Sequence, residues 1–258
     1  MINEKKNTSR SHTKEMEEVI IEIKNLHKAF GSNVILKGVN LNVSKGENVV
    51  VLGKSGSGKS VAIKCLVGLV EADQGEIKVF GSEISQMNTT ELNTVRSRMG
   101  FLFQNGALYD SMSVRENLAF TLKHHDKESS AEDIETQVRE ALKSVGLEDA
   151  IDKMPSELSG GMRKRIGLAR TLIIKPEIIL YDEPTTGLDT ITSREISELI
   201  LQIQEKYKTT SLIITHDMAC AKLTSNRIIV LKDGVIDAEG TYEELEKSDD
   251  PWVRSFFN

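Results

Sequence analysis

The chain has few cysteines, the residues that cross-link small secreted domains, and no apolar segment long enough to cross a bilayer. It contains two cysteines and four prolines in 258 residues. Cys65 and Cys220 stand far apart, so neither a disulfide framework nor a cysteine metal cluster is indicated. No apolar run reaches the roughly 18–20 residues that a membrane-spanning helix needs. We therefore expect free thiols in a reducing compartment and no membrane span.

The start of the chain also lacks the features of an export signal. Residues 1–18 are polar and charged, with neither an apolar core nor paired arginines. We expect them to form a flexible N-terminal tail, and we expect no export. The whole chain is 39% hydrophobic and 28% charged, which is typical of a globular protein. Its net charge of −6 provides no general basic face, so we predict no nucleic-acid partner.

The most informative motif is the stretch GKSGSGKS, residues 53–60, between the apolar run 49–52 and the helix-like residues 61–66. Glycines let backbone N–H groups curl around an anion, and the start of the following helix adds positive potential. The alternative is a plain glycine-rich helix cap, which the flanking strand and helix disfavour. The motif predicts a nucleotide phosphate loop, in which Lys59 reaches the β- and γ-phosphates and Ser60 ligates Mg²⁺. Its members are Gly53, Lys54, Ser55, Gly56, Ser57, Gly58, Lys59 and Ser60.

Short runs rich in β-branched residues predict two kinds of sheet. Residues 19–23 and 39–43 alternate or are densely β-branched and are flanked by turn residues, which indicates a small antiparallel sheet. The runs 49–52, 178–181 and 212–215 are short and lack polar alternation. Such runs are typical of parallel strands that are buried on both faces.

Helical spacing appears in the middle and at the end of the chain. Residues 131–145 carry apolar side chains on one helical face, within a region from about residue 104 that interrupts the strand pattern. This predicts a helical insert. Near the end, residues 242–245 and 252–257 indicate short helices. The second carries an apolar stripe, Trp252, Val253, Phe256 and Phe257, which is either core or a contact surface.

Two carboxylates directly follow a predicted buried strand, at the sheet edge where α/β proteins bind ligands. Asp182 is suited to Mg²⁺ held by Ser60. Glu183, which points the other way on an extended backbone, is suited to polarise an attacking water. The alternative is an acid pair at a helix start near Pro184. The phosphate loop favours the catalytic interpretation.

A histidine ends the third predicted parallel strand. A single histidine there is ordinarily a core or capping residue, but the shared sheet edge with Asp182 places His216 near the γ-phosphate. His124 and His125 lie in a polar stretch, and a solvated loop is favoured over a metal site there.

A second candidate anion site lies at Ser159, Gly160 and Gly161. Ser159 is a suitable helix N-cap, and the glycines leave the helix start bare. Because this site lies far along the chain from the phosphate loop, we expect it to complete the nucleotide site of another copy, in trans. An ordinary capped helix is the alternative. The basic cluster at residues 163–165 is predicted to be a solvated face or an interface.

Taken together, the motifs resemble the ATP-binding subunit of an ATP-binding-cassette (ABC) transporter, over about residues 19–240. They are the phosphate loop, Gln104, residues 158–161, Asp182 with Glu183, residues 187–189 and His216, in family order. The resemblance implies an α/β P-loop NTPase fold with a RecA-like parallel-sheet core and an N-terminal antiparallel β subdomain. It also implies an inserted α-helical subdomain at about residues 104–165 and a C-terminal helical extension at 241–258.

The resemblance further implies an ATPase that uses ATP and Mg²⁺ and forms a homodimer. Its catalytic residues are Glu183, His216 and Lys59, and its metal residues are Ser60, Gln104 and Asp182. Phe30 is expected to stack on adenine, Gln104 to sense Mg²⁺ and the attacking water, and Asp189 to lie at the dimer contact. Integral membrane permease subunits are the expected partners, with the chain peripheral at the cytoplasmic face of the inner membrane. Leu108, Tyr109, Met112 and Val114 are the expected docking surface for a permease helix.

A narrower resemblance comes from Met162 and two segments, residues 104–109 and 250–257, which are similar to the ATPase of Mla/Mce-type phospholipid transporters. It implies lipid transport, with an Mce-type lipid-binding protein as a further partner. Met162 and Arg163 stand where many ABC proteins have glutamine, so polar contacts made there by relatives do not carry over. The rival is a non-transport ABC ATPase that drives a soluble assembly complex of the iron–sulfur scaffold type.

Overall fold

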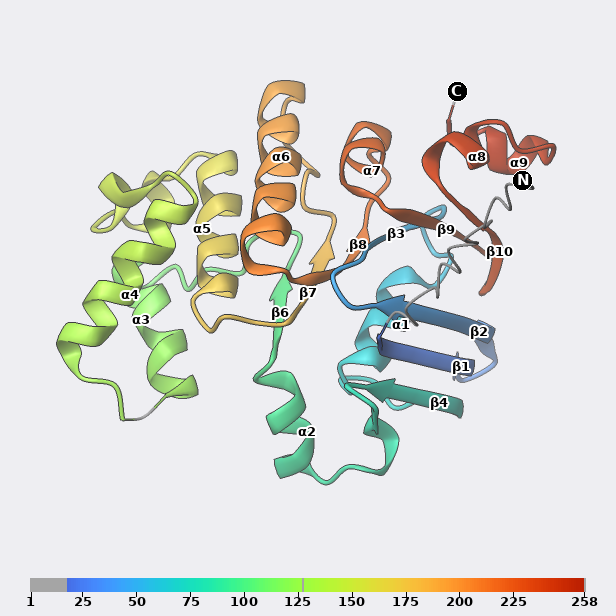
Figure 1. The fold of residues 1–258 in the computed structure, drawn as a ribbon, viewed down its shortest axis with the longest axis horizontal. Coiled ribbons are helices and arrows are strands. Elements are labelled where there is room, and N and C mark those ends of the chain that lie inside the picture. The colour runs from blue at the N-terminus through green and yellow to red at the C-terminus, as the bar shows by residue number, and fades with distance from the viewer. Residues whose placement is uncertain (1–17, 127, 258) are drawn as a thin grey trace, which may run out of the picture.

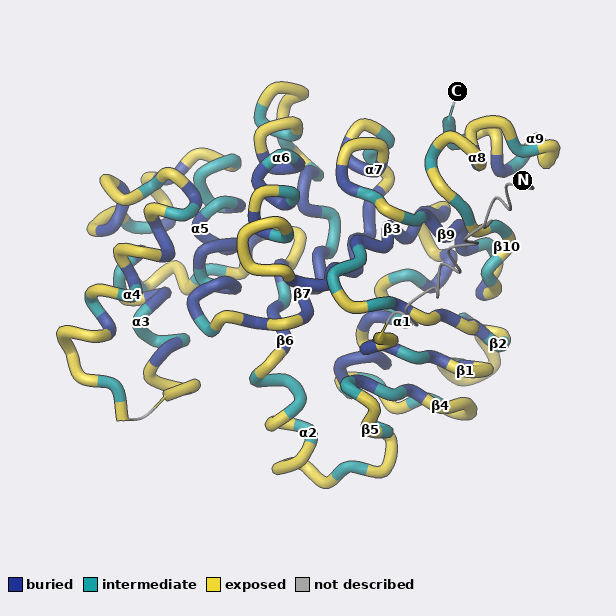
Figure 2. Tube along the Cα trace, viewed as in Figure 1, coloured by how far each residue is buried: buried dark blue, intermediate teal, exposed yellow. Residues whose placement is uncertain are grey.

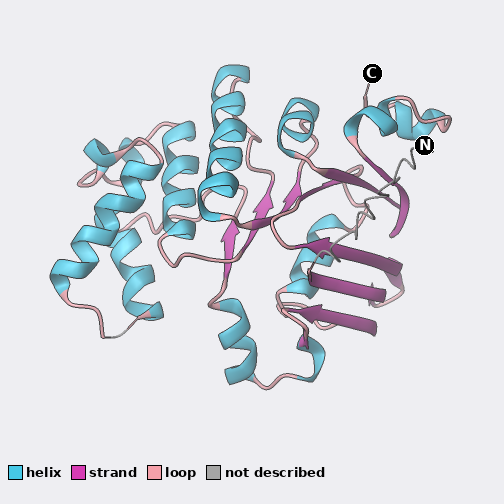
Figure 3. Ribbon diagram, viewed as in Figure 1, coloured by secondary structure: helices cyan, strands magenta, loops and turns pink. Residues whose placement is uncertain are grey.

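The computed structural model describes residues 18–126 and 128–257, so nearly all of the expected N-terminal tail lies outside the described residues. The chain forms an α/β fold with two sheets and a helical lobe (Figures 1 and 3). The strands are β1 (Val19–Phe30), β2 (Asn33–Ser44), β3 (Asn48–Leu52), β4 (Gln74–Val79), β5 (Ser82–Glu83), β6 (Met99–Leu102), β7 (Ile178–Asp182), β8 (Thr210–Ile214), β9 (Arg227–Lys232) and β10 (Val235–Gly240). The helices are α1 (Lys59–Leu66), α2 (Thr89–Arg96), α3 (Val114–His125), α4 (Ala131–Ser144), α5 (Gly160–Leu172), α6 (Thr190–Tyr207), α7 (Met218–Thr224), α8 (Tyr242–Glu246) and α9 (Pro251–Arg254).

The larger sheet has the order β10-β9-β3-β8-β7-β6. All neighbours from β9 to β6 are parallel, and only β10 runs antiparallel at the edge. The predicted parallel strands are confirmed as β3, β7 and β8, and Ile213 of β8 pairs with Val50 on one side and Tyr181 on the other. The carboxyl ends of the three strands therefore meet at one edge.

The smaller sheet has the order β2-β1-β4-β5 and is antiparallel throughout. Its first pair confirms the predicted entry sheet, with Ile23 opposite Leu41. Both strands are longer than the alternating patterns indicated. β1 continues to Phe30, and the turn at residues 31–32 joins it to β2 in a long hairpin.

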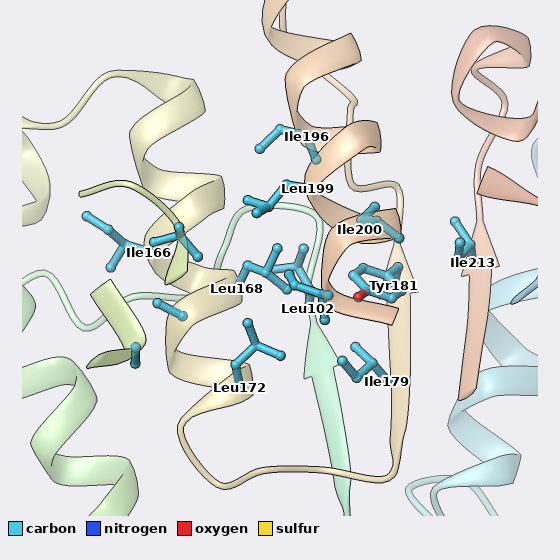
Figure 4. Packing of buried hydrophobic residues seen from close by; sticks show 14 of the residues in the cluster. Leu102, Ile166, Leu168, Leu172, Ile179, Tyr181, Ile196, Leu199, Ile200 and Ile213 are labelled. Carbon is cyan, nitrogen blue, oxygen red and sulfur yellow. The ribbon is translucent and has the colours of Figure 1, made fainter. Parts of the chain in front are cut away.

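The central strands of the larger sheet are buried along most of their length (Figure 2). Alternate residues of these strands contribute to two separate cores. Val49 and Val51 of β3 face α1 and the antiparallel sheet, whereas Val50 and Leu52 face the helices on the other side. This follows from the period of two along a strand. Figure 4 shows the helix-side core, where side chains of α5 and α6 pack against β6 and β7 (Leu102, Leu168, Leu172, Ile179, Tyr181, Leu199 and Ile200).

The helical lobe is formed by α3 and α4, which pack together and against α5. Ser113 and Ser130 each begin a helix with a capping box, and Val138 is fully buried. α5 continues past residue 165 to Leu172 and packs on the sheet, so the expected limit of the insert falls within this helix. Within the described ranges, no helix combines the length and apolarity that a bilayer crossing requires.

The C-terminal stripe packs against the helix-side core. Val253 is buried, and Trp252, Phe256 and Phe257 lie half-buried against the same cluster. Trp252 and Phe256 make an edge-to-face contact at 4.9 Å. Of the two alternatives for this stripe, the structure therefore favours a core contact.

Both thiols are expected to resist modification in the native protein. Cys65 and Cys220 are free and buried, and burial raises the pKa of each thiol to about 11. At pH 8 we expect Ellman's reagent to label neither cysteine in the folded chain and both after unfolding in guanidinium. The absorbance of released thionitrobenzoate measures this, and rapid labelling of the native protein would contradict it.

Candidate nucleotide-binding site

The phosphate loop joins β3 to α1, and its glycines are required by close contacts or by a left-handed backbone. A Cβ at Gly53 would lie 2.4 Å from the carbonyl oxygen of Leu231, and Gly58 has a φ of 106°. Among the described side chains, none caps the start of α1. The first backbone N–H groups of this helix are therefore available to an anion.

Lys59 lies across the loop. Its Nζ donates hydrogen bonds to the carbonyl oxygens of Gly53 at 2.7 Å and Lys54 at 3.0 Å. Burial lowers the pKa of Lys59, and the nearby carboxylates of Glu183 and Asp182 oppose this shift. The ammonium thus stays beside the loop and faces the acid pair.

Most of the predicted residues line one cavity of about 680 Å³. It lies at the carboxyl edge of β3, β7 and β8, where the phosphate loop, Gln104, the acid pair and His216 converge. Ile35, which the sequence analysis did not predict, also contributes because β2 passes the loop. The lining residues are Ile35, Gly53, Ser55, Gly56, Gly58, Lys59, Ser60, Val61, Gln104, Asp182, Glu183, Ile214 and His216.

The oxygen-bearing side chains in this cavity suit Mg²⁺. Ser60, Gln104 and Asp182 all line it. Burial raises the pKa of Asp182, with Glu183 adding to the shift. Within residues 18–126 and 128–257, no group of three or more His, Cys, Asp or Glu could hold a metal by itself. The donor set therefore fits a cation that takes one or two protein oxygens and completes its shell with phosphate and water.

Glu183 differs from the prediction in its backbone. Its φ is 53°, in the left-handed region, so the expected extended conformation is wrong. The turn is held because Glu183 N donates to the carbonyl oxygen of Ile214 at 2.9 Å. Its carboxylate Oε2 accepts from Thr186 Oγ1 at 3.0 Å and lies 2.8 Å from His216 Nδ1. The structure thus brings the predicted base and histidine into direct contact.

Lys164 is a residue of this site that the sequence analysis missed. It was assigned to a solvated basic face or an interface, but it is 5% exposed and its Nζ donates to the carbonyl oxygen of Glu183 at 2.9 Å. Burial lowers its pKa to about 8. The signal was available, because Lys164 lies on the same helical face as Leu168 and Thr171, which are buried. Arg165 is correctly placed nearer the surface and pairs with Glu195 at 2.6 Å.

The residues predicted to act in trans lie outside this chain's cavity. Ser159 Oγ accepts from Met162 N at 3.2 Å and so caps α5, and Ser159 and Gly160 are exposed. Asp189 caps α6 by accepting from the N–H groups of Ile191 and Thr192 at 3.0 Å. The roles of these residues in a second copy stay predictions.

Three further predicted residues lie away from the main cavity. Phe30 is 51% exposed at the end of β1. Lys54 and Ser57 border a smaller cavity of about 230 Å³ between the phosphate loop and the C-terminal helix α9. There the ring of Trp252 faces Lys232 at 4.3 Å and Lys54 at 6.0 Å. The C-terminal extension therefore contacts the back of the phosphate loop.

The expected permease-docking surface is partly wrong. Val114 is fully buried at the start of α3, since its first turn packs into the helical lobe. Tyr109 is 48% exposed, as expected. Phe103, which was not predicted, is 41% exposed and stacks on Phe101 at 4.1 Å. Phe103 and Tyr109 leave aromatic surface on the segment between β6 and α3.

Comparison with known proteins agrees with this site. The sequence model of the family described as "ABC transporter" matches residues 36–186. The chain is 43% identical to the "Probable ribonucleotide transport ATP-binding protein mkl" of Mycobacterium leprae, covering 93% of this chain and 69% of that protein. It is 39% identical to the "Intermembrane phospholipid transport system ATP-binding protein MlaF" of Haemophilus influenzae, covering 93% of this chain and 91% of that protein.

A solved structure shares the fold as well. The "Dimeric structure of a post-hydrolysis state of the ATP-binding cassette MJ0796 bound to ADP and Pi" superposes with a TM-score of 0.79 at 34% identity. The match covers 86% of this chain and 98% of that one. The predicted fold class is therefore confirmed.

Proposed function

Because this chain belongs to the ABC transporter family and is an ATPase subunit of that family, we propose that it powers phospholipid transport through partner permease subunits. The observation that carries the ATPase part is the single cavity where the phosphate loop, Asp182, Glu183 and His216 converge. The cargo, the partners, the location and the roles of individual residues are the proposed part. The chain acts as a peripheral subunit at the cytoplasmic face of the inner membrane.

The hydrolytic step uses residues of the chain in separate roles. Lys59 and the N–H groups of α1 bind the phosphates and offset their charge. Glu183 accepts a proton from the attacking water, and His216, 2.8 Å from its Oε2, keeps the carboxylate oriented. Ser60, Gln104 and Asp182 would hold Mg²⁺, which supplies charge neutralisation at the phosphates when bound.

The complete ATP site is proposed to form between two copies. Ser159, Gly160 and Gly161 begin α5 outside the cavity of their own chain, where they are free to meet the phosphate of a partner's ATP. The similarity to a cassette solved as a dimer supports this arrangement. ATP then joins the copies, and hydrolysis loosens them because the bridging charge changes.

Phospholipid is proposed as cargo because the chain matches nearly the full length of the phospholipid-transport relative. The ribonucleotide-transport relative is slightly more identical over the same share of this chain, but the chain covers only 69% of it. Phe103 and Tyr109 are the proposed contacts for a short helix of the permease, because their exposed rings offer an apolar surface.

The experiment is purification of the tagged chain from membranes of its own host, followed by identification of bound proteins and lipids. We expect a multi-span permease and phospholipid to co-purify, and the double variant F103A/Y109A to lose the permease while keeping ATP binding. Y207A, which removes an exposed ring at the end of α6 and outside the nucleotide site, is the control and should keep the permease. Recovery of a soluble assembly complex, or of a permease that transports ribonucleotides, would reject phospholipid transport.

A further inference from the structure

Lys164 connects two parts of the site that are proposed to serve different ATP molecules. It lies on α5, one turn after Gly160, and its Nζ donates to the carbonyl oxygen of Glu183 at 2.9 Å. Gly160 faces the partner's ATP in the proposed dimer, whereas Glu183 serves the ATP bound by its own chain. The side chain therefore spans from the helix of one site to the base of the other.

The surroundings of Lys164 indicate that its ammonium group serves to position Glu183. The side chain is 5% exposed, and in the described part of the chain its hydrogen-bond partner is this carbonyl rather than a carboxylate. A buried cation without an ion pair is costly, and an apolar side chain of similar length would fill the space at lower cost. Its lowered pKa reflects the same desolvation.

Glu183 is a residue whose alignment depends on its neighbours. A glutamate at a φ of 53° is strained and keeps this conformation only when surrounding contacts impose it. Those contacts come from Ile214 in β8, from Thr186 and from Lys164 on α5. Lys164 is the one that arrives from the helix of the in-trans glycines.

α5 is suited to hold Lys164 at this contact. The helix face below Lys164 is firmly packed, because Leu168 lies in the same buried cluster as Leu102 of β6 (Figure 4). The Lys164 ammonium therefore has a fixed place beside the carbonyl oxygen of Glu183.

We propose that Lys164 is a positioning residue that holds Glu183 aligned in the ATP site of its own chain. The proposal rests on the proposed function, in which Glu183 is the base and the glycines act in trans. Lys164 makes no contact with substrate and acts only through Glu183.

The first test is Lys164→Met, which fills the space but cannot donate a hydrogen bond. We expect kcat for ATP to fall by about 10- to 100-fold, as for a misaligned catalytic group, with little change in nucleotide affinity. Arg165→Met is the matched control, since it removes a basic residue of α5 that pairs with Glu195, and it should keep wild-type kcat. Wild-type kcat in K164M overturns the proposal.

Mixed dimers distinguish a loss of Glu183 alignment in the variant's own site from damage to the start of α5, which would impair the partner's site. K164M carries its defect in its own ATP site, whereas G160D carries its defect in the site it completes for the partner. Mixing the two leaves one intact site, so turnover should rise above either variant alone. K164M mixed with K59M leaves no intact site and should not recover.

The opposite pattern, rescue by K59M but not by G160D, would mean that Lys164 supports only its own helix start, and it overturns the proposal. Rescue by neither also overturns it. If K164M does not fold, K164L is the second donor-free variant, with the same readings. Turnover in G160D alone would instead reject the in-trans arrangement, so failure of the proposed function is told apart from failure of this inference.

Discussion

Glu183→Gln is expected to lower ATP turnover by about 100- to 10,000-fold, the usual contribution of a general base. Glutamine has the same shape and can keep the contacts with Thr186 and His216, but it cannot accept the proton of the attacking water. Because the phosphate loop is unchanged, ATP binding should persist. ATP should then hold two copies together, since the step that releases them is blocked.

Phosphate release and size-exclusion chromatography with ATP measure the two effects. Glu177→Gln is the control. It makes the same Glu-to-Gln change away from the cavity, where it removes an exposed ion pair with Arg98. It should turn over normally and elute as the wild type does. Wild-type phosphate release from E183Q would reject Glu183 as the base.

Local patterns predicted the parts of this site that depend on backbone conformation and strand ends. The phosphate loop is encoded by glycines at fixed spacing, and close contacts at Gly53 and Gly58 and a positive φ at Gly56 explain them. Asp182 and His216 were found because each follows a short apolar run, and parallel strands bring such ends to one edge. The order of the motifs along the chain indicated the family.

The missed features depend on contacts between segments distant in sequence. The helical pattern around Lys164 indicates that it is buried, but only the packing of α5 over β7 brings it to Glu183. The left-handed turn at Glu183 is imposed by β8. Val114 was expected at the surface because the sequence does not show which face of α3 turns into the lobe.

Gly160→Asp is expected to abolish turnover without harming the fold. A Cβ at Gly160 would lie 3.4 Å from Leu188 Cδ2, an ordinary contact, whereas one at Gly161 would lie 2.5 Å from Thr192 Cγ2. A carboxylate in the first turn of α5 favours the helix by about 0.3–1 kcal/mol, so thermal stability should be kept or slightly raised. The same charge repels the γ-phosphate of a partner's ATP, so the two-copy site cannot close.

The decisive measurement is complementation between defective chains. G160D retains its own phosphate loop, and K59M retains its glycines, so a mixed dimer contains one complete site. Equal mixing makes about half of the dimers mixed, and turnover should recover to at most about a quarter of wild type if each site works independently. G160N, which is neutral and of similar size, should keep more activity than G160D if repulsion is the cause. No recovery from mixing two folded, individually inactive chains would mean that the glycines act within their own copy, because only an in-trans site can be restored by exchange of partners.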